Sequence, residues 1–150
     1  MAPHSDEATT FSVVELGREE SLELLARSGI GRVTFSVHGV PVALPVNVAL
    51  LDDDVVFATD KGSKLDAAVQ GRVMSIEADG VDKVYHTGWS VVVTGVGEVL
   101  TDPRNVERVR RLPLQAWAPG PHPFIVRVPS SIVSGRRLAW EPGTDTGDKR

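Results

Sequence analysis

The 150-residue chain contains no cysteine. This absence excludes disulfide bonds, thiolate metal sites and a cysteine nucleophile, and it fits a cytoplasmic protein. The four histidines are scattered without the spacing of a metal-binding motif, so we predict no metal site. No serine stands in the sequence context of a nucleophile elbow, and no catalytic dyad is evident.

Long hydrophobic runs are also missing. No apolar stretch approaches the roughly 20 residues that span a bilayer, and the first residues lack the basic and apolar regions of a signal peptide. The formal net charge of −4 is opposite in sign to that of a typical nucleic-acid-binding domain. We therefore expect neither a membrane nor a nucleic acid among the partners, and a small molecule as substrate.

Aromatic residues make up only 5% of the chain, whereas valine accounts for 24 residues. Because β-branched residues favour strands, this composition predicts a mainly β fold. Residues 1–14 and 141–150 are polar, and we expect them to be flexible tails. The intervening residues 15–140 have the size of a single domain with one hydrophobic core.

The hydrophobic patterns predict a mixture of short helices and strands. Helices are expected at 18–28, 61–70 and 103–112. Strands are expected at 33–37, 40–51, 55–59, 72–78, 89–100, 124–128 and 132–138. The first three strands are joined by short turns and should form an antiparallel meander, whereas 79–88 should be a polar loop and 113–123 irregular. The pattern predicts a six- or seven-stranded antiparallel split β-barrel with peripheral helices, not a doubly wound nucleotide-binding fold.

Prolines and glycines mark special positions in these strands. Pro41 and Pro45 cannot donate to a β-ladder, which predicts an edge, a bulge or an opening in the sheet. Gly95 and Gly97 predict a sharp bend in the long strand. Asn47 stands in an otherwise apolar strand, and its amide must meet either a neighbouring loop or the polar edge of a ligand.

One segment has the composition of a phosphate site. It runs from a strand end through a glycine into a helix and brings together Thr59, Lys61, Ser63 and Lys64. Two hydroxyls, two ammonium groups and the free N–H groups of a helix start suit a phosphate. The alternative is that Ser63 forms a capping box with Asp66 and that both lysines are only solvated.

Other polar residues have a simpler interpretation. Arg104, Arg108 and Arg111 share one face of a predicted helix, and a solvated face is favoured over an anion site. His86 precedes Trp89 in a polar loop, where solvation is favoured over contact with a substrate.

Four pieces of the chain together resemble a known family. They are Ser28–Val33, Pro41–Asn47, Phe57–Leu65 and Trp89–Gly95. In this order and spacing they resemble the pyridoxamine 5′-phosphate oxidase-like, FMN-binding split-barrel proteins over residues 15–138, and in particular the small bacterial branch with nitroimidazole reductase-like members.

The resemblance implies a homodimer with two FMN sites at the subunit interface. The phosphate would contact Thr59, Ser63 and Lys64, with Lys61 nearby, and the ring would lie along the strand near Asn47. The implied cofactor-binding residues are Pro45, Val46, Asn47, Thr59, Lys61, Ser63 and Lys64, with Trp89 and Ser90 from the other subunit. The expected function is an oxidoreductase that transfers hydride at flavin N5, so no dedicated catalytic residue is required.

Departures from the family pattern keep other functions open. Leu65 replaces a second basic residue, and Arg137–Trp140 lacks the substrate-binding pattern of the vitamin B6 oxidases, so we do not predict that activity. One alternative is a deazaflavin-dependent reductase that uses Arg32, Arg72 and Lys61 to hold a longer anionic cofactor. A second alternative is a non-enzymatic dimer that binds haem or another cofactor.

Overall fold

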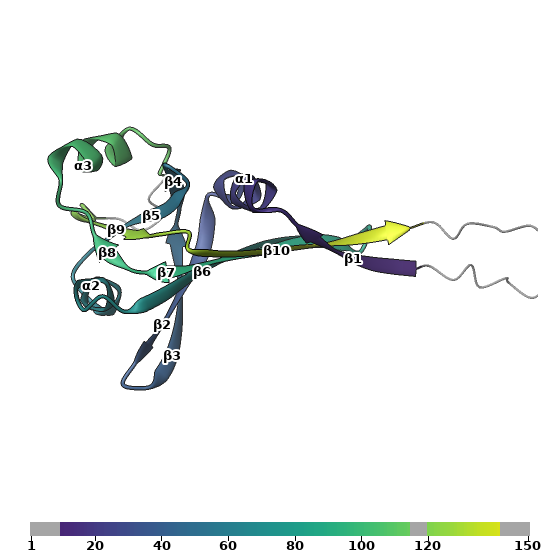
Figure 1. Ribbon diagram of the computed structural model, residues 1–150, viewed down its shortest axis with the longest axis horizontal. Helices are drawn as coiled ribbons and strands as arrows, with labels where there is room; N and C mark the ends of the chain where they lie inside the picture. The colour runs from purple at the N-terminus through teal and green to yellow at the C-terminus, as the bar shows by residue number, and fades with distance from the viewer. Residues whose placement is uncertain (1–9, 115–119, 142–150) are drawn as a thin grey trace, which may run out of the picture.

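The computed structural model describes residues 10–114 and 120–141, shown as a ribbon in Figure 1. The strands are β1 (Thr10–Leu16), β2 (Ile30–Val37), β3 (Val40–Asn47), β4 (Ala49–Leu51), β5 (Asp54–Thr59), β6 (Val73–Asp82), β7 (Thr87–Val96), β8 (Glu98–Val99), β9 (Phe124–Val128) and β10 (Ile132–Glu141). The helices are α1 (Arg18–Ser28), α2 (Ser63–Val69) and α3 (Pro103–Arg110). None of the described helices has the length and apolar character needed to cross a membrane.

The strands form two antiparallel sheets. The larger sheet has the order β1-β10-β7-β6-β2-β3, and the smaller has the order β4-β5-β9-β8. The prediction of a mainly β split barrel with peripheral helices is therefore confirmed. The described residues hold more strands than the six or seven predicted, because the segments 40–51 and 89–100 each divide between the two sheets and β1 was not predicted.

The first of these divisions lies between β3 and β4. The N–H of Val48 donates to the carbonyl oxygen of Gly29 at 3.1 Å instead of continuing the ladder. The chain then leaves the larger sheet, and β4 pairs with β5 in the smaller one. The predicted meander is therefore not one continuous sheet: β2 pairs with β3 in the larger sheet, whereas β4 pairs with β5 in the smaller one. As Pro41 and Pro45 indicated, β3 is an edge strand.

The second division lies between β7 and β8, where Gly95 and Gly97 predicted a bend. The N–H of Gly97 donates to the carbonyl oxygen of Arg72 at 2.9 Å. A Cβ on Gly95 would collide with the backbone oxygen of Pro129, and one on Gly97 would collide with the sulfur of Met74. Glycine is required here because other chain segments approach the backbone closely.

The predicted polar loop 79–88 is wrong. Strand β6 continues to Asp82 and β7 begins at Thr87, so the two strands form a long hairpin with a short turn. The Asp82 carboxylate accepts hydrogen bonds from the N–H groups of Val84 and Tyr85, at 2.9 and 3.1 Å. The polar side chains misled the prediction because this end of the hairpin is exposed, while its backbone is still fully paired.

The expected N-terminal tail also contains regular structure. Strand β1 pairs with β10 from Thr10 opposite Glu141 to Leu16 opposite Gly135. Residues 10–14 are therefore part of a strand and not of a tail, and residue 141 belongs to β10. Residues 1–9 and 142–150 lie outside the described part. The prediction missed this strand because β1 is held by backbone pairing with the distant strand β10, which the local sequence does not reveal.

The hydrophobic core lies between the two sheets and the first two helices. It includes Leu25 of α1, Phe57 of β5, Met74 and Ile76 of β6 and Val93 of β7, which are all fully buried. The side chains of β5 alternate between two clusters. Phe57 belongs to the main core, whereas Val56 faces a second cluster beneath α3 that includes Val109 and Ile125. The smaller sheet is thereby fixed between the main core and α3, and its ends position the site.

Candidate functional site

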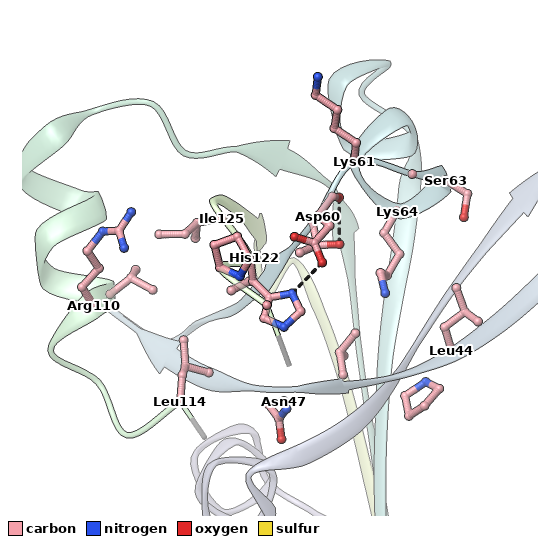
Figure 2. A pocket seen from close by; sticks show the side chains of 18 of the residues that line it. Leu44, Asn47, Asp60, Lys61, Ser63, Lys64, Arg110, Leu114, His122 and Ile125 are labelled. Carbon is pink, nitrogen blue, oxygen red and sulfur yellow. Dashed lines mark hydrogen bonds and ion pairs between the residues drawn. The ribbon is translucent and has the colours of Figure 1, made fainter. Parts of the chain in front are cut away.

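A cavity of about 610 Å³ lies where β3, β5, α2 and α3 come together (Figure 2). This volume is within the range of small-molecule sites. Seven of the nine predicted cofactor-binding residues line it: Pro45, Val46, Asn47, Thr59, Lys61, Ser63 and Lys64. The end of β3 in the larger sheet and the end of β5 in the smaller sheet thus contribute to one cavity.

The segment from β5 to α2 forms one end of the cavity. Gly62 has a φ of +155° and is the N-cap of α2, which begins at Ser63. The predicted capping box of Ser63 and Asp66 is therefore wrong, because Ser63 lies inside the first turn and makes no capping hydrogen bond. The Ser63 hydroxyl has no hydrogen-bond partner in residues 10–114 and 120–141, so it is available to a ligand.

The two lysines of this end have no ion-pair partner among the described residues. Lys61 is exposed and Lys64 half-buried, and both line the cavity. Thr59 is 4% exposed, and its hydroxyl donates to the carbonyl oxygen of Asp60 at 3.2 Å. Leu65, which departs from the family pattern, is part of the main core. A basic side chain at that position would point into the core and not into the cavity.

Asn47 lies at the end of the edge strand β3, opposite Ile30. Its Oδ1 atom is buried and has no hydrogen-bond partner within the described part of the chain. The expected alternative, a bond to a neighbouring loop, is not present among these residues. Because an unmet buried polar atom costs about 1–3 kcal/mol, Asn47 is a place where a ligand with a polar edge gains stability.

Sequence reasoning missed the other side of the cavity. The Nδ1 atom of His122 lies 2.8 Å from Oδ2 of Asp60, and both residues line the cavity (Figure 2). Arg110, Leu112 and Leu114 extend the wall from the end of α3. No motif spacing identifies these residues: Arg110 ends α3, and His122 lies in the proline-rich segment before β9. Part of the segment predicted as irregular, residues 115–119, lies outside the described residues.

Trp89 and Ser90 do not line this cavity. Both are on β7, where Trp89 lines a second, open groove of about 1060 Å³ and Ser90 is exposed. The groove is formed by the far ends of β1, β6, β7 and β10. Its walls include the exposed side chains Phe11, Val81, Val84, Tyr85 and Leu138.

His86 also belongs to this groove and not to the cavity. It stands in the β6–β7 turn with a φ of 52°, and its ring centroid lies 6.4 Å from that of Phe11.

The three cations considered for a deazaflavin groove do not come together. Arg32 donates to Glu77 at 2.8 Å and to Asp79 at 2.9 Å, and Arg72 donates to Gln70 and to a backbone oxygen. Only Lys61 of the three lines the cavity. Burial raises the pKa of Glu77, and a hydrogen bond with Glu77 lowers the pKa of Asp79.

The arginine face of α3 is solvated, as predicted, and is largely paired with acids. Arg108 donates to both carboxylate oxygens of Asp52, at 2.7 and 2.6 Å. Arg111 donates to Glu107 at 3.3 Å. The arginine of α3 that lines the cavity is instead Arg110.

Comparison with known proteins agrees with this architecture. The chain is 38% identical over 152 residues to the uncharacterized protein Rv0080 of Mycobacterium tuberculosis, covering 96% of this chain and 99% of the relative. An FAD binding protein from Mycobacterium smegmatis superposes with a TM-score of 0.72 at 29% identity, covering 83% of this chain and 98% of the other.

A more distant structure shares the fold alone. It is a candidate 5-nitroimidazole antibiotic resistance protein from Bacteroides thetaiotaomicron, 14% identical, with a TM-score of 0.67 and coverage of 93% of this chain and 96% of the other. The family model described as pyridoxamine 5′-phosphate oxidase matches residues 17–137. The chain therefore belongs to the pyridoxamine 5′-phosphate oxidase family.

Proposed function

We propose that this protein is a flavin-dependent oxidoreductase that binds FMN in the cavity between β3 and α2. The observation that carries the proposal is the buried, unpartnered Oδ1 of Asn47 in the same cavity as Lys61, Ser63 and Lys64. A flavin nucleotide has a polar ring edge and a phosphate, which are complementary to these two sets of groups. The FAD-binding relative from Mycobacterium smegmatis supports a flavin in this fold.

In this proposal each end of the cavity has a distinct task. Lys64 and the Ser63 hydroxyl bind the phosphate by charge-assisted hydrogen bonds, and Lys61 adds positive charge at the exposed entrance. Asn47 meets the polar edge of the ring, with Pro45 and Val46 beside it. The bound flavin supplies hydride transfer at N5, so the protein contributes position and electrostatics more than acid–base chemistry.

The proposal includes a homodimer. The groove at the far ends of β6 and β7 exposes Val81 at 72%, Val84 at 80% and Tyr85 at 71%. An apolar surface of this kind is typical of a protein interface. A second copy would cover it, and Trp89 and Ser90 are proposed to reach the flavin of the partner.

A flavin titration of the purified protein tests the cofactor. We expect absorption bands near ~370 and ~450 nm from bound flavin, whereas one band near ~420 nm would indicate a deazaflavin or haem instead. Lys64→Ala should weaken FMN binding by about 1.5–3 kcal/mol, or roughly 10- to 150-fold.

Two controls make this test specific to the phosphate. Riboflavin, which has no phosphate, should lose little affinity through Lys64→Ala. Arg104→Ala removes an exposed cation outside the cavity and should leave FMN binding unchanged. Equal losses for FMN and riboflavin would show that Lys64 acts through the structure of the site. Failure of the wild-type protein to bind any flavin would refute the proposed function.

A further inference from the structure

We propose that the Arg110 side of the cavity binds a second anionic group, separate from the flavin phosphate and attached to an apolar body. This inference rests on the proposed function, because it assumes that Lys64 and Ser63 hold the phosphate. The anionic group can come from either of two sources: the additional phosphate of a dinucleotide flavin, or a carboxylate on the substrate.

The first argument is the charge balance of α3. Arg108 and Arg111 are neutralised by Asp52 and Glu107. Arg110 has no hydrogen bond or ion pair with any residue in 10–114 and 120–141, although it stands between these two paired arginines. Of the three, the arginine without an acid is the one that lines the cavity.

The second argument is the separation of the cations. Figure 2 shows Arg110 on α3 at one side of the cavity and Lys61 and Lys64 at the other, with the Asp60–His122 pair between them. A single phosphate at the lysines is therefore not also a partner for Arg110. The cavity has two cationic sides, and a ligand with only one anionic group leaves one of them without a partner.

The third argument is the character of the wall beside Arg110. Leu112 and Leu114 are half-buried there and pack against the second hydrophobic cluster, and Ile125 is buried. Arg110 itself is exposed, and a guanidinium without a partner in the described chain can bind a planar carboxylate or phosphate in a bidentate manner. The ligand part at this side should therefore combine an anionic group with an apolar or aromatic surface.

Binding measurements with Arg110→Gln test the inference, with Arg104→Gln as the matched control. Arg104 is an exposed residue of the same helix and does not line the cavity, so both variants lose one positive charge from α3. The dissociation constants of FMN and FAD are measured by flavin fluorescence. Benzoate and its neutral analogue benzamide are then titrated by calorimetry into the FMN-loaded protein.

If the anionic group belongs to the cofactor, Arg110→Gln should weaken FAD binding at least tenfold and change FMN binding less than twofold. If it belongs to the substrate, both flavins should bind as before, and benzoate but not benzamide should lose affinity at least tenfold. Arg104→Gln should change none of these constants. The inference is overturned if Arg110→Gln alters neither FAD nor benzoate binding, or only repeats the effect of Arg104→Gln. FMN binding that depends on Lys64 would still uphold the proposed function in that case.

Discussion

The cavity and the groove are built from contrasting surfaces. The cavity lies at the end of the molecule formed by the smaller sheet, α2 and α3, and its walls carry Lys61, Lys64 and Arg110 without acidic partners in the described chain. The groove lies at the opposite end, where the hairpin β6–β7 extends beside β1 and β10 (Figure 1). Its walls carry exposed valines and a tyrosine.

The contrast indicates what each region is suited to bind. Unpaired cations around a hollow of about 610 Å³ favour a small anionic molecule, since charge and hydrogen bonds are what such a ligand offers. Exposed apolar side chains spread over an open groove favour a protein surface, because hydrophobic burial is the main favourable term in association.

The most damaging change expected at the groove is Val81→Glu. In a dimer that covers the groove, the new carboxylate would lose water without gaining a partner, so the dimer should dissociate at least about 100-fold more readily. Val73→Glu is the control, because Val73 is 62% exposed on the same strand but outside the groove. Sedimentation velocity measures both. A Val81→Glu variant that dimerises as the wild type does would remove the groove from the interface.

The next largest effect is expected where β7 of the larger sheet approaches the connection from β9 to β10. Gly95 lies where β7 approaches Pro129, and a Cβ there would strike the Pro129 oxygen. Gly95→Ala should lower the free energy of unfolding by about 2–3 kcal/mol, because backbone atoms cannot move aside as a side chain does. Urea denaturation measures this loss. Gly17→Ala, where the added Cβ meets open space, should cost less than half as much.

Asn47→Ala separates a ligand role from a structural one. Flavin affinity should fall by about 1–2 kcal/mol, roughly 5- to 30-fold, for both FMN and riboflavin, because the ring edge loses a partner. The melting temperature of the protein without flavin should stay nearly the same, since Oδ1 has no partner to lose within the described residues. A lower melting temperature with unchanged flavin binding would assign Asn47 to the structure alone.

Local sequence patterns predicted the parts of the fold that depend on neighbouring residues. Helix α1 has the predicted bounds, and Gly29 ends it with a φ of 65°. The edge position of β3 also follows from Pro41 and Pro45, which restrict the backbone directly, and the break between β7 and β8 falls at Gly97. The pairing of β1 with β10 and the division at Val48 were missed, because both depend on partners distant in sequence.

The same distinction holds for the site. The residues from Thr59 to Lys64 are contiguous, so the sequence alone could predict that they lie close together at one site. Asp60 was passed over although it lies within that segment, because its partner His122 is 62 positions away. Arg110 was missed because the helical pattern singled out the solvated face of α3 and not the residue beside the cavity.

The smallest effect is expected at the paired arginine that contrasts with Arg110. The hydrogen bond from Arg108 lowers the pKa of the Asp52 carboxyl in the folded protein. A carboxyl group with a lowered folded-state pKa binds fewer protons than in the unfolded chain, so it adds stability above its unfolded pKa and loses that contribution as the pH falls. Asp52→Asn should therefore be slightly less stable than the wild type at neutral pH, and the difference should shrink as the pH falls below about 4 and vanish only below the lowered folded-state pKa.

Thermal unfolding of both proteins across this pH range measures the difference. Asparagine is a suitable replacement because Asp52 has a φ of 49°, a conformation that asparagine also tolerates. The effect should be small, since both partners are exposed and surface ion pairs contribute little. A stability difference that persists at low pH would show that Asp52 acts through the turn it occupies. The paired arginine would then no longer be an electrostatic counterpart to Arg110, and the contrast along α3 would rest on Arg111 alone.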